Sequence, residues 1–275
     1  MIGQEKLRWQ ISEQIGRGVF PKFAIISGSV GQGKKTLARL IAKQQKIPHY
    51  ILEDVKVDTI RKMISDSYKV RERICYIIPD ADRMSLAAKN SLLKVTEEPP
   101  NKSSFILTVS DESTLLNTIK SRGTIYRMHN YSKEDLQEYI GDLRDDFMLA
   151  VCENMHEIDL MRRRSSEEYY EQAHKILDKI ADISIANALK SRQMIAFKED
   201  DDGLDFRLLL KSFQYIVMND YKRDEITDFD YIAELIMTTN RAFMNFRVSA
   251  LNKQSIYDMW IFDLRKVIHK YEERQ

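Results

Sequence analysis

Cysteine is scarce in this chain of 275 residues, and histidine is only slightly more frequent. Cys75 and Cys152 lie far apart, form no Cys-x-x-Cys pair and match no zinc-ligand spacing, which excludes a disulfide framework and a zinc module. We expect both to be buried, reduced thiols. No histidine pair has the spacing of metal ligands and no serine sits in a nucleophile elbow, so no metal site is predicted. The histidines are His49, His129, His156, His174 and His269.

An excess of charge of one sign is also missing. Lysine and arginine number 43 against 42 aspartate and glutamate residues, so DNA binding would need a local basic patch. No apolar run approaches the ~18 residues of a membrane-spanning helix. Residues 1–6 lack the apolar stretch of a signal peptide. These absences predict a cytoplasmic protein with no membrane partner.

Short aliphatic runs alternate with helical patterns in the first half of the chain. Continuous β-branched and aliphatic runs, bounded by glycine, proline and acidic residues, are typical of parallel strands buried on both faces. Strands that alternate with helices predict an α/β sheet with crossover connections. The predicted strands are 23–27, 74–78 and 105–109, with a weaker one at 50–52, and the predicted helices include 34–45 and 86–98.

After about residue 128 the strand patterns stop and helical patterns follow. Ser132 and the acidic residues behind it predict a helix N-cap. The acidic stretch 199–203 is the candidate linker, and the arginines at 162–164 are expected to face solvent. Aromatic residues of the tail fall at helical spacings, which favours core packing over base stacking. The helical patterns cover 134–164, 166–197, 205–222, 228–249 and 253–273.

The strongest local motif is rich in glycine and lies between a predicted strand and a predicted helix. Residues 28–36 read Gly-Ser-Val-Gly-Gln-Gly-Lys-Lys-Thr. Gly28, Gly31 and Gly33 let the backbone turn tightly so that its N–H groups face phosphate oxygens. Lys34 reaches the terminal phosphates, and the helix N-terminus adds a partial positive charge. The motif therefore predicts a phosphate loop for ATP or ADP.

One position of this loop departs from the pattern. The serine or threonine that ligates Mg²⁺ belongs directly after Lys34, where this chain has Lys35. Thr36 comes one step late, and successive helical residues are rotated by about 100°, so we do not expect it to replace the missing ligand of Mg²⁺. The alternatives are a loop that binds no nucleotide and a loop that binds one without turning it over.

A second motif of ATP hydrolysis is also incomplete. ATPases of this class end a strand with an acid for Mg²⁺, followed by a catalytic acid that orients water. Here the predicted strand runs into Pro79, Asp80 and Ala81. If the following helix sets the register, Pro79 stands at the metal position and Asp80 at the catalytic one. If Asp80 ends the strand, Ala81 stands at the catalytic position. One carboxylate is missing in either register, so Asp80 is a degenerate acidic position.

Several segments occur in the order found in clamp-loader subunits. The stretch 88–100, Ala-Lys-Asn-Ser-Leu-Leu-Lys-Val-Thr-Glu-Glu-Pro-Pro, is similar to the Asn-Ala-Leu-Leu-Lys-Thr-Leu-Glu-Glu-Pro-Pro segment of bacterial clamp loaders. The stretch 115–123 looks like the segment that ends in that family's Ser-Arg-Cys motif, with glycine in place of the cysteine. With the phosphate loop and the stretches 3–5 and 80–84, these motifs make residues 1–130 resemble an AAA+ clamp-loader subunit of bacterial DNA polymerase III, nearest to the delta-prime type.

The resemblance implies an α/β AAA+ core of the P-loop NTPase kind, a helical lid and an all-α C-terminal domain of the collar type. We assign these to residues 1–128, 129–165 and 166–275. It also implies ATP or ADP as the ligand, and other clamp-loader subunits, the sliding clamp and primed DNA as partners within an assembled complex. The four-cysteine zinc module of many relatives has no counterpart here, and the lid stretch 154–159 carries no sensor arginine.

Arg122 receives its role from the same resemblance. The delta-prime subunit typically does not hydrolyse ATP and presents this arginine to the ATP of its neighbour. A guanidinium is planar and permanently charged, so it can neutralise charge that develops on the transferred phosphoryl group. The alternative is that Arg122 only pairs with a carboxylate at the domain edge. Ser110 lies near the family's polar sensor position, and Val109 is equally close in register.

Three functions remain open at this point. The first is an ATPase-silent clamp-loader subunit, part of an ATP-driven polymerase assembly, that supplies Arg122 as an arginine finger in trans. The second is an active AAA+ ATPase subunit of a clamp loader or a DNA-remodelling motor, which would need Thr36 or a water molecule to hold Mg²⁺. The third is a scaffold subunit that binds no nucleotide.

Overall fold

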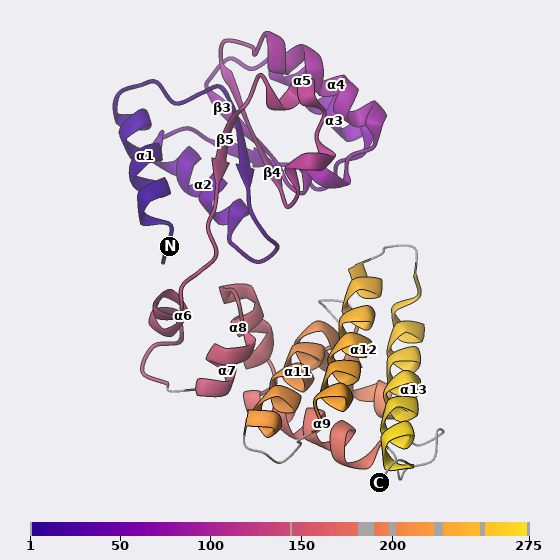
Figure 1. Cartoon of the computed structure of the whole chain (residues 1–275). Helices are drawn as coiled ribbons and strands as arrows, with labels where there is room; N and C mark the ends of the chain where they lie inside the picture. The colour runs from indigo at the N-terminus through magenta and orange to yellow at the C-terminus, as the bar shows by residue number, and fades with distance from the viewer. Residues whose placement is uncertain are drawn as a thin grey trace. The chain divides into compact units, whose positions relative to one another are not determined.

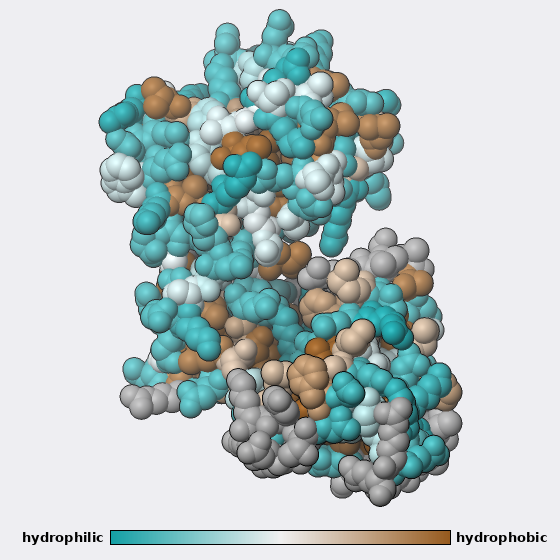
Figure 2. Space-filling model, viewed as in Figure 1, coloured by the Kyte–Doolittle hydropathy of each residue, from teal (hydrophilic) through white to brown (hydrophobic). Residues whose placement is uncertain are grey.

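The chain folds into two compact units, residues 1–139 with 154–156 and residues 140–153 with 157–275 (Figure 1). The computed structural model describes residues 2–143, 145–180, 190–197, 202–222, 228–247 and 251–273. Residues 181–189, 199–201 and 248–249, which belong to predicted helices and to the predicted linker, lie outside the described residues. Within the described part no helix is long and apolar enough to cross a membrane, and hydrophilic residues cover most of the face seen in Figure 2. The three-part division at residues 128 and 165 stays a prediction.

The first unit is built on a parallel five-stranded sheet, which confirms the predicted α/β class. The strand order is β2-β3-β4-β1-β5. The strand β5 was not predicted, because it has only four residues, of which Thr124, Ile125 and Tyr126 indicate a strand, and it pairs with β1 alone. The strands are β1 (Phe23–Ser27), β2 (His49–Ile51), β3 (Ile74–Ile78), β4 (Ser103–Val109) and β5 (Thr124–Arg127).

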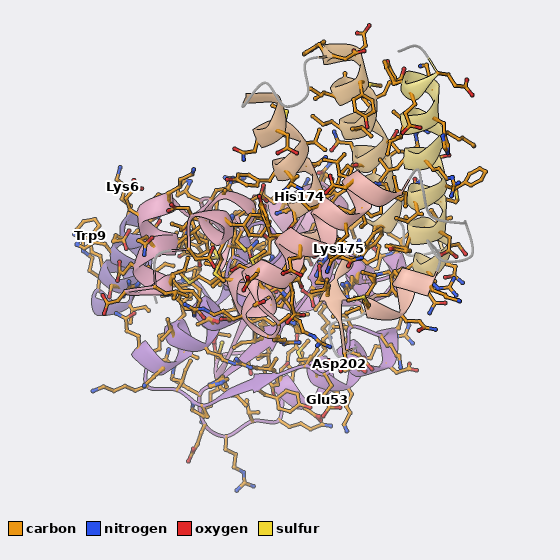
Figure 3. All side chains as sticks on the ribbon, turned by 90° about the horizontal axis from the view of Figure 1, so that it is seen from below. Lys6, Trp9, Glu53, His174, Lys175 and Asp202 are labelled. Carbon is orange, nitrogen blue, oxygen red and sulfur yellow. The ribbon has the colours of Figure 1, made fainter. Side chains whose placement is uncertain are left out.

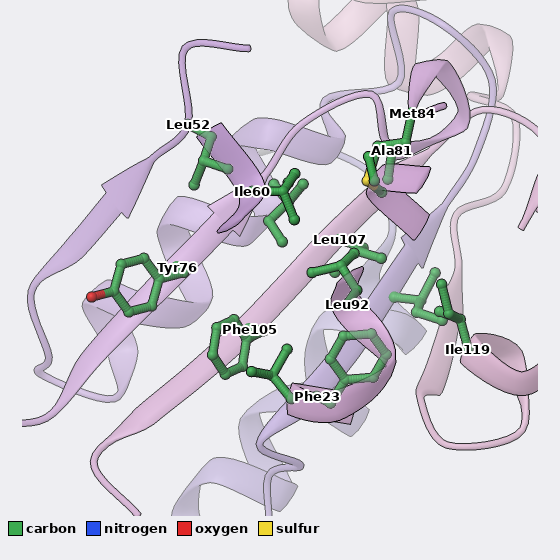
Figure 4. Close-up of a cluster of buried hydrophobic side chains, with 14 of the residues drawn as sticks. Phe23, Leu52, Ile60, Tyr76, Ala81, Met84, Leu92, Phe105, Leu107 and Ile119 are labelled. Atoms are coloured by element: carbon green, nitrogen blue, oxygen red, sulfur yellow. The ribbon is translucent and has the colours of Figure 1, made fainter. Parts of the chain in front are cut away.

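Side chains of β1 alternate between two hydrophobic cores. Phe23 and Ile25 join the cluster drawn in Figure 4, which includes residues of α3, α4 and α5. Ala24 and Ile26 join the cluster that includes residues of α1 and α2. Because both faces are covered, every residue of β1 is buried, and the strand reads as a continuous apolar run. The helices are α1 (Glu5–Gly16), α2 (Lys34–Gln44), α3 (Val57–Ser67), α4 (Leu86–Glu97) and α5 (Asn117–Lys120).

The connection that follows β1 and the connection that follows β4 run to opposite faces of the sheet. The chain passes from β1 into α2, which packs in one core, and from β4 into α5, which packs in the other. A ligand crevice forms beyond the carboxyl ends of parallel strands at such a divergence. The phosphate loop begins at this crevice, where the Gly28 N–H donates to the Val109 carbonyl at 3.1 Å.

The predicted helix 134–164 is wrong as a single element. It consists of α6 (Lys133–Ile140), α7 (Asp146–Val151) and α8 (Met155–Arg162). Gly141 takes φ +79° behind α6, a conformation that suits glycine, and Asp145 caps α7 by accepting from the Met148 N–H at 2.8 Å. The predicted cap at Ser132 is confirmed, since its hydroxyl accepts from the Asp135 N–H at 3.1 Å.

Aromatic residues fill the core of the second unit, as predicted. The Trp260 ring lies 5.7 Å from Phe206 and 5.4 Å from Phe213, centroid to centroid, and its N–H donates to Thr239 at 3.2 Å. Tyr257 and Phe246 are buried as well, whereas Tyr215 and Phe243 are half-buried. The main helices of this unit are α9 (Ser166–Lys179), α11 (Phe206–Lys222), α12 (Phe229–Arg247) and α13 (Lys253–Glu272).

The end of the predicted helix 166–197 is also wrong. Here a 3-10 turn, η3 (Ser191–Met194), leads into β6 (Ile195–Ala196), which pairs with β7 (Leu204–Asp205). Gly203 precedes β7 with φ +140°, and an added Cβ would lie 2.7 Å from the Met194 carbonyl. Asp202 of the predicted linker, labelled in Figure 3, pairs with the Arg164 guanidinium at 2.6 Å.

Both cysteines are free and buried, which confirms their prediction as structural thiols. Burial raises the pKa of Cys75 to about 11, so this thiol is not a nucleophile near neutral pH. His174, labelled in Figure 3, lies 4.6 Å from the Tyr170 ring, centroid to centroid. In the described ranges no three histidine, cysteine or acidic side chains gather as a metal site would require.

Gly123, which stands where clamp-loader subunits carry cysteine, is closely covered by β1. An added Cβ would lie 2.7 Å from Ile25 Cδ1 and 2.9 Å from the Phe23 ring. We expect Gly123→Ala to lower the free energy of unfolding by about 1–3 kcal/mol, because both contacts are with close-packed core residues. Urea denaturation measures this change.

Gly16→Ala is the matched control. Apart from its chain neighbours and the backbone of α1 itself, no atom lies within 4 Å of a Cβ added at Gly16, the last residue of α1. This variant should leave stability unchanged or raise it by up to about 1 kcal/mol. Equal losses in the two variants would contradict the close packing at Gly123.

Candidate nucleotide-binding site

The three predicted glycines of the phosphate loop each have a local structural reason. Gly33 caps α2 with φ +82°, and Gly31 takes φ +85°. A Cβ on Gly31 would also collide with the Asn154 side chain. A Cβ on Gly28 would collide with the Gln32 side chain and lie 3.0 Å from Met128 Cβ. The backbone of the loop therefore favours glycine by its positive φ at Gly31 and Gly33, and by close side-chain contacts at Gly28.

Lys34 is buried and uses all three of its N–H donors inside the protein. They reach the carbonyls of Gly28 at 2.6 Å and Ser29 at 2.8 Å, and the Ser110 hydroxyl at 3.2 Å. Burial lowers the pKa of Lys34, and the charges of Asp80 and Asp82 oppose that shift. A phosphate that binds Lys34 must therefore replace backbone carbonyls of the loop as the acceptors of its N–H groups.

Lys35 pairs with the acid that follows β3. Its Nζ lies 3.2 Å from an Asp80 carboxylate oxygen, and the two side chains are 50% and 36% exposed. Asp80 takes φ +49°, and its N–H donates to the Thr108 hydroxyl at 3.2 Å. Thr36 is exposed on α2. An ammonium group thus occupies the position where a metal-binding hydroxyl belongs, so these residues do not fit Mg²⁺.

Ser110 joins the lysine to the second acid of this region. Its hydroxyl accepts from Lys34, and its N–H donates to Asp82 Oδ1 at 3.0 Å. Val109, the other residue near the sensor register, is buried in the core beside β1. Of these two residues, only Ser110 places a polar side chain at the loop.

Other contacts that fix the loop come from distant parts of the sequence. The Gln32 amide donates to Asn130 at 2.7 Å, and the Tyr131 hydroxyl donates to the Gln32 carbonyl at 2.8 Å. Outside the loop, the Gln4 side chain bonds the backbone of His129, the neighbour of Asn130, and accepts from its N–H at 2.9 Å. The sequence predicted no role for these residues or for Thr108 and Asn154. For Gln4, the resemblance of residues 3–5 to clamp-loader subunits could have indicated a role. No local sequence pattern marks the other residues.

Arg122 stands apart from this cluster, behind α5. Its guanidinium lies 2.8 Å from Glu97 Oε1 and donates to the Thr118 carbonyl at 2.9 Å. The side chains of Arg122 and Glu97 are 35% and 52% exposed. The structure therefore shows the edge ion pair that the sequence left open as an alternative, formed with the first glutamate of the Glu-Glu-Pro-Pro stretch.

Asp82→Asn tests the electrostatics of the cluster. The amide oxygen of asparagine can still accept from the Ser110 N–H, but the carboxylate charge is lost. We expect the pKa of Lys34 to fall further, because the Asp82 charge favours the ammonium form. An NMR titration of the labelled Lys34 Cε measures this pKa.

Asp66→Asn, which removes a carboxylate from α3, is the control and should leave the pKa of Lys34 unchanged. If the pKa of Lys34 stayed constant or rose in Asp82→Asn, the assigned coupling between the two groups would be wrong.

Comparison with known proteins finds similarity to subunits of DNA polymerase III. The model of the family described as "DNA polymerase III, delta subunit" matches residues 39–132. DNA polymerase III subunit gamma of Buchnera aphidicola from Schizaphis graminum is 30% identical over 171 residues, 51% of this chain and 47% of the relative. Subunit delta' of the same organism is 28% identical over 193 residues, 64% of this chain and 56% of the relative. The chain thus spans about half the length of the curated relatives it matches.

A solved structure has the same fold. A gamma-subunit-related protein of DNA polymerase III from Thermotoga maritima matches with a TM-score of 0.53 and 16% identity, covering 95% of this chain and 99% of that one. The family match, the curated relatives and the parallel sheet with its phosphate loop agree. The chain is thus similar in sequence to subunits of bacterial DNA polymerase III and shares the fold of the Thermotoga maritima protein.

Proposed function

We propose that the chain is a cytoplasmic clamp-loader subunit of the delta-prime type. It does not hydrolyse ATP itself, and it supplies Arg122 to the ATP of a neighbouring subunit while a sliding clamp is loaded on primed DNA. The observation that carries this proposal is the Lys35–Asp80 ion pair, 3.2 Å long, at the position where hydrolysing relatives need a metal-binding hydroxyl.

The end of β3 supports catalytic silence. The strand ends at Ile78, so Pro79 and Asp80 take the next two positions. This favours the register in which proline replaces the metal-binding acid. Asp80, the acid left to orient water, is paired with Lys35. Phosphoryl transfer depends on positioning and on metal charge, so a site without either acts poorly on bound ATP.

The setting of Arg122 supports its use in trans. Its ion pair with Glu97 is partly exposed on both sides, and such pairs contribute only about 0–1 kcal/mol. Exchange of the Glu97 carboxylate for phosphate oxygens of a neighbour would therefore cost little. The planar guanidinium keeps its charge and suits phosphate oxygens in the same way as a carboxylate.

Exposed apolar side chains on the C-terminal helices support assembly with sister subunits. Met237 and Met244 are exposed on α12, and Met259 and Phe262 on α13. Apolar groups on a folded unit are stabilised when a partner covers them. They suit the collar-type oligomerisation proposed for residues 166–275.

The scaffold alternative has one supporting observation. Lys34 satisfies all its donors within the protein, so its placement requires no nucleotide. The active-ATPase alternative is less well supported, because Thr36 is exposed on α2 and Lys35 stands in its place beside Asp80.

Two variants separate the trans role of Arg122 from the edge ion pair. Arg122→Ala and Glu97→Gln remove opposite halves of the same pair. If Arg122 acts on a neighbour's ATP, Arg122→Ala should reduce turnover at the site it serves by about 10³-fold, whereas Glu97→Gln should leave turnover unchanged or slightly raised. The measurement is DNA-stimulated ATP turnover of the reconstituted complex, with assembly checked by size-exclusion chromatography.

Arg127→Ala is a second control, since it removes an exposed arginine of β5 that pairs with Glu112 at 2.7 Å. It should leave turnover unchanged. Equal turnover of all three variants and the unmodified complex would remove the trans role. Equal losses of ATP turnover in Arg122→Ala and Glu97→Gln would show that the ion pair serves the structure of the subunit.

A further inference from the structure

We propose that the phosphate loop binds ADP and ATP without a divalent cation, and that the Lys35 ammonium supplies the positive charge which Mg²⁺ supplies in related loops. This inference deepens the proposed function and rests on it, because a silent subunit holds its nucleotide without turning it over. It identifies the ligand of the loop as metal-free nucleoside di- or triphosphate.

The first turn of α2 concentrates positive charge. Lys34 and Lys35 are the first two residues of this helix, and the first N–H groups of a helix have no acceptor within it. The helix dipole adds partial positive charge at the same end. A nucleotide without Mg²⁺ carries more negative charge than its metal complex, and two adjacent lysines at a helix N-terminus match that charge.

The acids at the end of β3 are already engaged. Asp80 pairs with Lys35 at 3.2 Å, and Asp82 accepts from the Ser110 N–H at 3.0 Å. A divalent cation at Asp80 would meet the Lys35 ammonium as a like charge in the same place. The Lys35 ammonium thus fills the metal position in the free loop, and on a bound phosphate it supplies the positive charge that Mg²⁺ would supply.

Lys35 is free to change partners when phosphate arrives. The ion pair with Asp80 is exposed to solvent on both sides, so exchange for a phosphate oxygen costs little. Asp80 keeps its backbone bond to Thr108 after the exchange, and its carboxylate remains accessible to water. The same lysine therefore has an acid partner in the free loop and a phosphate partner in the bound one.

Isothermal titration of the full chain with ADP tests the proposal, in Mg²⁺ and in EDTA. Binding in EDTA should be as tight as in Mg²⁺ or tighter, because no metal contributes at the loop and Mg²⁺ in solution competes with the loop for ADP. Lys35→Ala should weaken ADP binding in EDTA by about tenfold, as expected when a charge-assisted bond to phosphate is lost. Lys35→Arg keeps the charge and should retain most of the affinity.

Lys43→Ala is the matched control, because it removes an exposed lysine from the last turn of the same helix. It should bind ADP like the unmodified chain, and circular dichroism should show that all variants are folded. Loss of binding by tenfold or more when EDTA replaces Mg²⁺ would overturn the proposal. Absence of ADP binding in both buffers would overturn it as well, while the role of Arg122, measured on the neighbour's ATP, would stand.

Discussion

Burial of β1 on both faces is the constraint on which the rest of the first unit depends. Its five residues are buried, and their side chains alternate between one core with α1 and α2 and another with α3, α4 and α5. Helices must therefore cover both faces of the sheet. The connections after β1 and β4 diverge, and the crevice that results receives the phosphate loop. The same packing leaves no room for a Cβ at Gly123, directly behind Arg122.

The loop keeps the backbone of a nucleotide site but has changed its chemistry. Gly28, Gly31 and Gly33 retain the shape that presents N–H groups to phosphate. Lys35 and Asp80 replace the hydroxyl and metal position with an ion pair. We therefore infer that the loop can still bind a nucleotide but does not activate water to hydrolyse it. Arg122 remains exposed enough to act elsewhere, and we infer that the chain contributes to hydrolysis through a neighbour.

Much of this was readable from the sequence, because the parts concerned have local patterns. The continuous apolar runs predicted the observed bounds of β1 and β3, and they predicted β2 to within one residue. The fourth strand, β4, begins at Ser103, two residues before its predicted start. The glycines and lysines of the loop follow from their spacing. The short edge strand β5 carried too weak a pattern. The breaks at Gly141 and Asp145 within the predicted helix 134–164 were missed, since charge-rich helical periodicity continues across them.

Contacts between distant residues could not be predicted in the same way. The sequence predicted, as one alternative, that Arg122 pairs with some carboxylate at the domain edge. It could not identify that carboxylate as Glu97, because the partner depends on how α4 and α5 pack. Asn154 and Tyr131 reach the loop, and Thr108 reaches Asp80, from positions far along the chain, and no spacing rule connects them. Local chemistry is therefore encoded in short motifs, whereas the positioning of each motif depends on tertiary packing.

The most direct test of the account is steady-state ATP turnover by the isolated chain in Mg²⁺, with and without primed DNA. The account predicts no turnover above background in either condition, because Lys35 and Pro79 leave the loop without a site for metal-assisted hydrolysis. Robust turnover that disappears in Lys34→Ala would contradict it and would make the chain a motor subunit in its own right.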